Sequence, residues 1–141
     1  MNTKKLILAA LVAFAAMFIV DGLWFEVIFK SYNQTLWDQA GLPAANDSEL
    51  MHALATLFFA FLLAWIYPMG YKGGTAMNEG IKFGLWMGLV YQLPGSIHWF
   101  AALGGSPAMP CFLTANGIVN GIIGGICIAK IYGGKSAAAA S

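Results

Sequence analysis

Polar side chains that could do chemistry lie inside otherwise apolar segments of this sequence. Asp21 interrupts the first apolar run, His52 lies near the start of the second, and His98 lies near the end of the third. The fourth run carries Asn116 and Asn120, whose four-residue spacing places them on one face of a helix. At membrane depth such groups are costly, so they normally face protein or a watery cavity. Together they form a candidate site that could hold a cation, a proton or a small polar ligand.

Depth and helical angle refine this prediction. When each helix is read in its own direction, these groups and Glu26 fall in the half of the bilayer away from the chain termini. Asp21 and Glu26 are about 140° apart on an ideal helix, so we expect only the deeper Asp21 to face inward. His98 follows Gly80 by about five full turns and should face the same neighbouring helix, unless a kink at Pro94 turns it away.

Other interpretations of these residues stay open. They could form interhelical hydrogen bonds without a ligand, which is the commoner use of one polar residue in a membrane helix. His52 and His98, at equal depth on antiparallel helices, could be axial ligands of a b-type haem. Cys111 could complete a metal centre, although no close metal-ligand spacing is present. Because structural use of two histidines is much commoner, the sequence predicts no catalytic residue, no metal site and no cofactor.

The composition explains why these groups are expected in a membrane. Of 141 residues, 60% are hydrophobic and 9% charged, and the mean hydropathy of +0.72 is far above the soluble globular range. Seven lysines, no arginine and a net charge of +1 give no field for binding nucleic acid. We therefore predict an integral membrane protein with no nucleic-acid partner.

Four segments are long and apolar enough to cross a bilayer, which requires about 20 residues of helix. The sequence therefore predicts an all-α fold, a four-helix bundle that forms a single transmembrane domain over residues 1–141. The predicted spans are residues 6–29, 48–67, 76–103 and 110–132. Asn46 and Glu49 form a capping-box pattern before the second span, Pro68 should end that span, and Pro110 suits the first turn of the fourth.

The lysines predict the orientation of the bundle. Six of the seven lie on one side of the predicted spans: Lys4, Lys5, Lys72, Lys82, Lys130 and Lys135. Because cytoplasmic loops carry the excess of positive charge, we expect both termini in the cytoplasm and the protein in the inner membrane. A cleaved signal ending near Ala13-Phe14-Ala15 is an alternative for the first segment, but the apolar run continues to Phe29 and has spanning length.

Glycine recurs at every fourth position in the third and fourth predicted spans. The positions are Gly80, Gly84 and Gly88 in one span and Gly117, Gly121 and Gly125 in the other. Such GxxxG ridges allow two backbones to approach closely. We therefore expect these two helices to pack against each other within one chain, and the alternative is that one ridge forms a contact between copies.

Part of the sequence resembles a known family. The stretch from Tyr67 to Gly74, the segment from Glu79 to Gly88 and the Leu23-Trp24-Phe25 step are similar to small bacterial four-span membrane proteins of unknown function, of the domain-of-unknown-function 1761 type. The resemblance covers most of residues 6–132 and rests on glycine and aromatic patterns. It implies a fold and no assigned activity.

From these features we expect a non-catalytic membrane protein. The predicted role is an accessory, assembly or self-associating subunit, surrounded by the lipid bilayer, with a larger membrane complex or a second copy as partner. A small transporter or channel that uses the polar site is the first alternative. A haem- or metal-binding electron carrier is the second.

Overall fold

The computed structural model describes residues 2–41, 49–71 and 74–133, and in these ranges it contains helices and no strand. The elements are α1 (Thr3–Gly22), the π-helix η1 (Leu23–Ile28), α2 (Lys30–Gln39), α3 (Glu49–Gly70), α4 (Ala76–Leu103) and α5 (Ala108–Gly133). The all-helical fold class predicted from the sequence is therefore confirmed for the described ranges.

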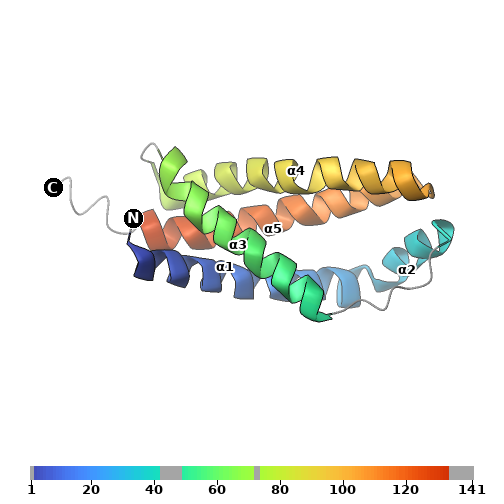
Figure 1. The fold of residues 1–141 in the computed structure, drawn as a ribbon, viewed down its shortest axis with the longest axis horizontal. Coiled ribbons are helices and arrows are strands. Elements are labelled where there is room, and N and C mark those ends of the chain that lie inside the picture. Colours follow the sequence, from blue (N-terminus) through green and yellow to red (C-terminus); the bar gives the residue numbers. More distant parts are fainter. Residues whose placement is uncertain (1, 42–48, 72–73, 134–141) are drawn as a thin grey trace.

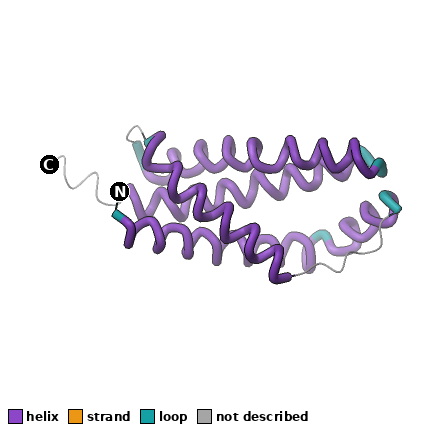
Figure 2. Tube along the Cα trace, viewed as in Figure 1, coloured by secondary structure: helices purple, strands orange, loops and turns teal. Residues whose placement is uncertain are grey.

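The long helices form a bundle in which α5 contacts α1, α3 and α4 (Figure 1). α4 and α5 run side by side along their length, whereas α3 crosses the bundle at a larger angle. The start of α1, the start of α4 and the end of α5 lie at one end of the bundle, and α2 lies at the other (Figure 2).

Three helical segments of the described chain are long and apolar enough to cross a membrane. They are Thr3–Ile28, Glu49–Gly70 and Ala108–Gly133, with mean hydropathies of 2.5, 1.9 and 1.7. They match three of the four predicted spans to within a few residues. α4 has the predicted bounds of the remaining span, but its apolar content is lower and it is not among these three.

Proline does not end the second predicted span. Pro68 lies inside α3, which continues to Gly70. A proline this close to the end of a helix removes one backbone hydrogen bond without preventing the next residues from taking helical angles, so the prediction that Pro68 ends the helix is wrong. Asn46, the predicted cap of this helix, lies outside the described residues.

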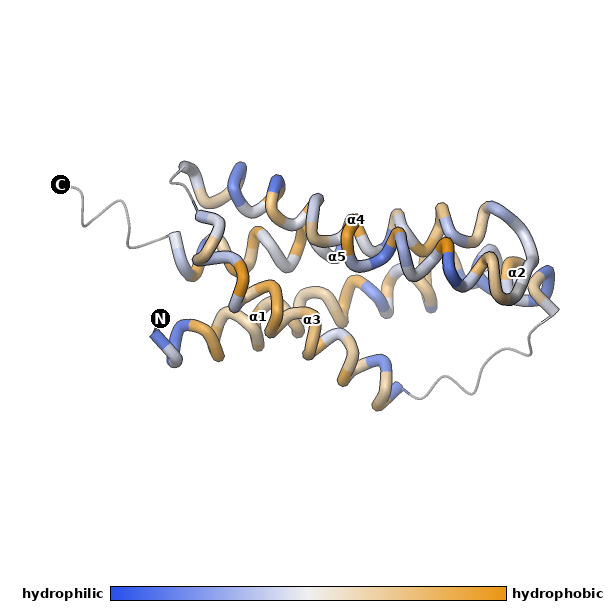
Figure 3. The backbone as a smooth tube through the Cα atoms, turned by 45° about the horizontal axis from the view of Figure 1, so that its top comes forward, coloured by the Kyte–Doolittle hydropathy of each residue, from blue (hydrophilic) through white to orange (hydrophobic). Residues whose placement is uncertain are grey.

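Small residues make up much of the core, beside Met17, Leu63 and Ile128, and many large apolar side chains are exposed on the surface. Ala9, Ala13 and Ala60 are 0% exposed in one cluster that joins α1, α3 and α5. In contrast, Phe58 is 64% exposed and Trp86 is 66% exposed. Small residues allow close helix packing in lipid, where large apolar side chains gain nothing from facing inward. This size distribution, with the dominance of hydrophobic residues along α1 and α3 in Figure 3, is typical of a membrane bundle.

The glycines of α4 face those of α5. A Cβ added at Gly84 would lie 2.5 Å from the carbonyl carbon of Gly121, and one added at Gly80 would lie 2.8 Å from the carbonyl oxygen of Gly125. At Gly88 the added atom would contact the backbone of Gly117. Each ridge therefore fits into the other within one chain, which leaves no room there for a side chain.

The sequence analysis did not predict α2. Its buried Leu36 packs with Met109 and Phe112 of α5 in a second apolar cluster, against which Trp24 and Phe29 also pack. This cluster anchors α2 across the end of the bundle, next to the polar groups described below.

Candidate functional site

Asp21 is the centre of a buried polar cluster. It lies in the last turn of α1 and is 7% exposed. Asn116 donates from Nδ2 to Oδ1 of Asp21 at 3.0 Å, and the Nδ2 of Asn120 donates to the same oxygen. The Nε2 atom of His52 lies 3.2 Å from Oδ2 of Asp21. Three helices, α1, α3 and α5, thus bring their polar residues to one carboxylate.

These contacts hold the Asp21 carboxylate with donors on both oxygens. Hydrogen bonds to an ionised acceptor are stronger than those between neutral groups, so the two amides link α5 firmly to α1 through Asp21. The contact with His52 becomes an ion pair when the imidazole is protonated. The side chain of His52 is 40% exposed and that of Asp21 is 8% exposed. The imidazole therefore lies between the buried carboxylate and the surface of the protein.

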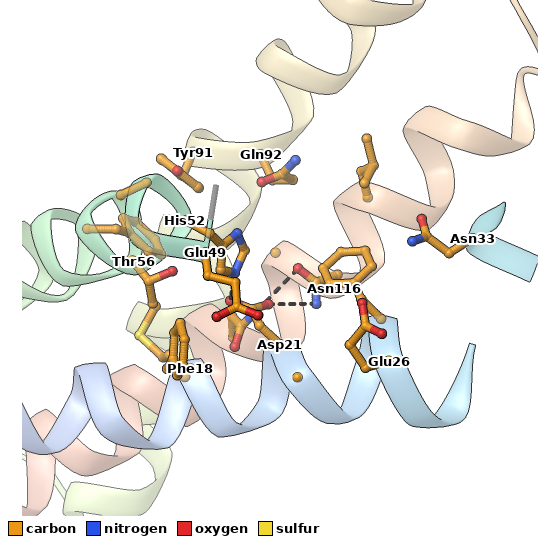
Figure 4. Close-up of a pocket in the computed structure, with 18 of the residues that line it drawn as sticks. Phe18, Asp21, Glu26, Asn33, Glu49, His52, Thr56, Tyr91, Gln92 and Asn116 are labelled. Carbon is orange, nitrogen blue, oxygen red and sulfur yellow. Dashed lines mark hydrogen bonds and ion pairs between the residues drawn. The ribbon is translucent and has the colours of Figure 1, made fainter. Parts of the chain in front are cut away.

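The cluster lines a cavity of about 630 Å³ between α1, α3, α4 and α5. The lining residues are Met17, Phe18, Asp21, Gly22, Phe25, Glu26, Asn33, Trp37, Glu49, His52, Ala55, Thr56, Phe59, Tyr91, Gln92, Leu113, Asn116, Gly117 and Asn120. In Figure 4 the side chains of Asp21, His52 and Asn116 converge on one region of this cavity, with Tyr91 and Gln92 across from them. The volume suits a small organic molecule, since ligand pockets typically measure about 300–1,000 Å³.

Aromatic residues join α3 to α4 at the inner wall of the cavity. The rings of Phe59 and Tyr91 are stacked, with centroids 4.1 Å apart and planes inclined by 18°. Phe18 contacts the His52 ring with a centroid distance of 6.1 Å. The polar cluster is therefore bordered by aromatic rings, which the sequence analysis did not identify as part of the site.

Glu26 also lines this cavity, contrary to the ideal-helix prediction. The chain enters η1 after Asp21, and there the N–H of Phe29 donates to the carbonyl of Trp24, five residues back, at 3.0 Å. A π-turn contains more residues than an α-turn, so the direction of Glu26 rotates back towards that of Asp21. Glu26 is 70% exposed and lies 3.5 Å from Nζ of Lys30, so Asp21 alone is the buried carboxylate of the pair.

His98 is exposed and does not line the cavity, so its predicted inward direction is wrong. The face of α4 that meets α5 follows every fourth residue, from Gly80 through Gly88 to Ser96, which is 1% exposed. Each such step turns the face by about 40° around an ideal helix, so near Ser96 it no longer has the angle of Gly80. His52 and His98 are therefore not brought together as haem ligands would require.

A metal centre is not assembled in the described part of the chain either. No group of three or more His, Cys, Asp or Glu residues there could hold a metal ion. Cys111, the further ligand considered from the sequence, is exposed in the first turn of α5 and does not line the cavity.

Besides the aromatic lining, two details of the polar groups were not predicted from the sequence. Glu49 was assigned only to a helix cap, but it lines the cavity. Asn120 is 5% exposed, and its Oδ1 atom is buried with no hydrogen-bond partner among the described residues. An unpaired buried acceptor is costly, so a donor from a ligand or water would be stabilising at this place.

Comparison of the chain with protein-family models, with curated proteins and with solved structures found no match. The resemblance to the domain-of-unknown-function 1761 type therefore stays a prediction.

Proposed function

We propose that this chain is a four-span protein of the inner membrane that binds a small polar ligand in the cavity around Asp21. The observation that carries this proposal is the convergence of Asp21, His52, Asn116 and Asn120 from three helices on a cavity of about 630 Å³. Interhelical hydrogen bonds alone would not require such a space between the helices.

The assignment of α4 as the fourth span is supported by its length and by its packing against α5. Its 28 residues would extend about 42 Å, more than the roughly 30 Å of a hydrocarbon core. Gly80 and Gly88, two turns apart, contact the backbone of α5, itself one of the three strongly apolar helices. A helix packed along a spanning helix in this way would share its depth.

The proposed orientation puts the cavity on the outer side. Lys4, Lys5, Lys82 and Lys130 lie towards the end of the bundle where α1 begins, and Lys30 lies at the end with α2. With the lysine-rich end in the cytoplasm, the cavity, which α2 residues help to line, faces the extracytoplasmic side.

The proposed role is non-catalytic. Binding in this cavity suits the recognition step of a small transporter. An accessory or assembly subunit is the second candidate, and a stripe of exposed apolar residues on α4 favours it. Trp86, Val90, Leu93 and Ile97 are 66%, 66%, 40% and 53% exposed at alternating spacings of four and three residues. This spacing is that of a helix-docking seam, which a larger complex or a second copy would cover.

The test compares two neighbouring positions at one depth. Ala55 lines the cavity, whereas Leu54, about 100° around α3, lines an apolar groove against α1 and is 48% exposed. In a background without the two natural cysteines, a membrane-impermeant thiol reagent added outside intact cells should modify Ala55→Cys and leave Leu54→Cys unmodified. Equal modification of both, or of neither, would contradict a water-accessible outer cavity.

The second candidate function, an accessory or assembly subunit, is tested by a separate measurement. Native mass spectrometry of gently extracted protein would reveal a larger complex or a homo-oligomer. Trp86→Ala combined with Ile97→Ala should dissociate such an assembly if the α4 stripe forms the contact. An unchanged assembly would place the contact elsewhere.

A further inference from the structure

We infer that the ligand of this cavity is an organic cation: a protonated amine carried on an apolar or aromatic body. The inference rests on the proposed binding function and deepens it by naming the class of ligand. Charge, hydrogen-bonding capacity, aromatic lining and volume each support it.

The charges around the cavity favour a cation. Asp21, Glu26 and Glu49 line it, and no lysine does so among the described residues. Lys30, outside the lining, pairs with Glu26, and His52, the basic side chain of the described lining, contacts Asp21, so Glu49 adds a further negative charge. An anionic ligand would enter beside a buried carboxylate and be repelled, whereas a cation would gain from the same field.

The hydrogen-bond acceptors around Asp21 favour a ligand that donates hydrogen bonds. Oδ1 of Asp21 already accepts from both asparagines, but Oδ2 has a second lone-pair site beyond the contact with His52. Asn120 turns its Nδ2 to Asp21, and its Oδ1, bonded to the same carbon, is the buried acceptor without a partner described above. Oδ2 of Asp21 therefore offers an acceptor site beside a second, enclosed acceptor, and an ammonium group, with three donors and no acceptor, matches the Oδ2 site.

The apolar part of the lining suits the body of such a ligand. Five aromatic residues line the cavity: Phe18, Phe25, Trp37, Phe59 and Tyr91. Ring faces attract cations and also cover apolar groups. A proton or a bare metal ion would need neither these rings nor the volume of the cavity.

The experiment uses the full-length protein purified in detergent and three small probes of similar shape. These are 2-phenylethylamine, which is protonated at pH 7, the neutral 2-phenylethanol, and the anion phenylacetate. We expect only the amine to raise the melting temperature saturably. In Asp21→Asn, the dissociation constant for the amine should rise by at least about tenfold, equivalent to ~1.4 kcal/mol.

Asp38→Asn is the matched control, because it removes the same charge from an exposed residue of α2 that does not line the cavity. Its affinity for the amine should equal that of the wild type. If Asp21→Asn does not fold, Glu49→Gln and Tyr91→Leu replace it. Each should weaken amine binding, because Glu49 supplies charge and Tyr91 a ring face.

The outcomes separate the ligand class from the binding function. Saturable binding of the alcohol or of phenylacetate, equal to or tighter than that of the amine, would overturn the cationic ligand and leave the binding cavity supported. Amine binding that is unchanged in Asp21→Asn, or in both replacement variants, would overturn the assignment of this site. Failure of all three probes to bind would overturn the inference, and the cysteine-modification test would then decide whether an accessible cavity exists at all.

Discussion

Replacing Gly84 by alanine should separate the two helices that form the rigid part of the bundle. The added Cβ would lie 2.5 Å from the carbonyl carbon of Gly121 and 2.6 Å from Cα of Ile122. These neighbours are backbone atoms of a packed helix, so neither can rotate away as a flexible side chain would. Ordinary contact needs a further separation of about 1 Å, because protein interiors are close-packed.

The loss of stability in Gly84→Ala follows from two opposing effects. Overpacking of this kind costs about 1–3 kcal/mol, while alanine gains up to about 1 kcal/mol over glycine in helix propensity. With the full gain subtracted, the net loss should be about 0–2 kcal/mol, which corresponds to a fall in melting temperature of up to roughly 8 °C for a chain of this size. The measurement is thermal unfolding of the purified protein in detergent.

Gly95→Ala is the matched control in the same helix. An added Cβ there meets nothing within 4 Å, so only the gain in helix propensity applies. This variant should be as stable as the wild type or more stable. If Gly84→Ala melted at or above the temperature of Gly95→Ala, the close contact between α4 and α5 would be refuted.

Three further predictions concern other parts of the molecule. With both natural cysteines removed, a cysteine at Asn46 should react with an impermeant reagent outside the cell and one at Gly74 should not, because the proposed orientation, based on the lysines, puts Gly74 in the cytoplasm; labelling at Gly74 would contradict that orientation. Phe112→Ala should lower stability by about 3 kcal/mol, since its ring contacts four aromatic neighbours at 5.3–5.9 Å, and an unchanged melting temperature would show that these contacts contribute little. A double-mutant cycle of Asp21→Ala and Asn116→Ala should give a coupling of about 0.6–1.7 kcal/mol, and a coupling near zero would mean that their hydrogen bond is not formed.

Much of the fold was predictable because its signals repeat along the sequence. Hydropathy alone locates three spans to within a few residues, and four-residue spacing identifies the ridge that contains Gly84 and the ridge that contains Gly121. Asp21, Asn116 and Asn120 were predictable as a group, since buried polar residues of a membrane bundle seek one another.

The errors have two causes: a local departure from α-helical geometry, and the drift of a contact face around a regular helix. One π-turn redirects Glu26 into the cavity, and the drift of the α4 contact face turns His98 out. Neither effect changes the composition, so neither leaves a hydropathy signal. α2 was missed because it is only ten residues long and polar on average, and Leu36 is the residue that it buries against α5.

The cavity itself follows from the distribution of residue size along the bundle. Towards the lysine-rich end, Ala60 and Ala64 of α3 are 0% exposed and pack in one cluster with Ala9 of α1 and Ala129 of α5, which brings these helices close together. Towards the other end, α3 diverges from α4 (Figure 1). Residues of both helices, among them His52 and Ala55 of α3 and Gln92 of α4, line the cavity there. The tilt of α3, fixed by alanines at one end, therefore sets the width of the cavity around Asp21.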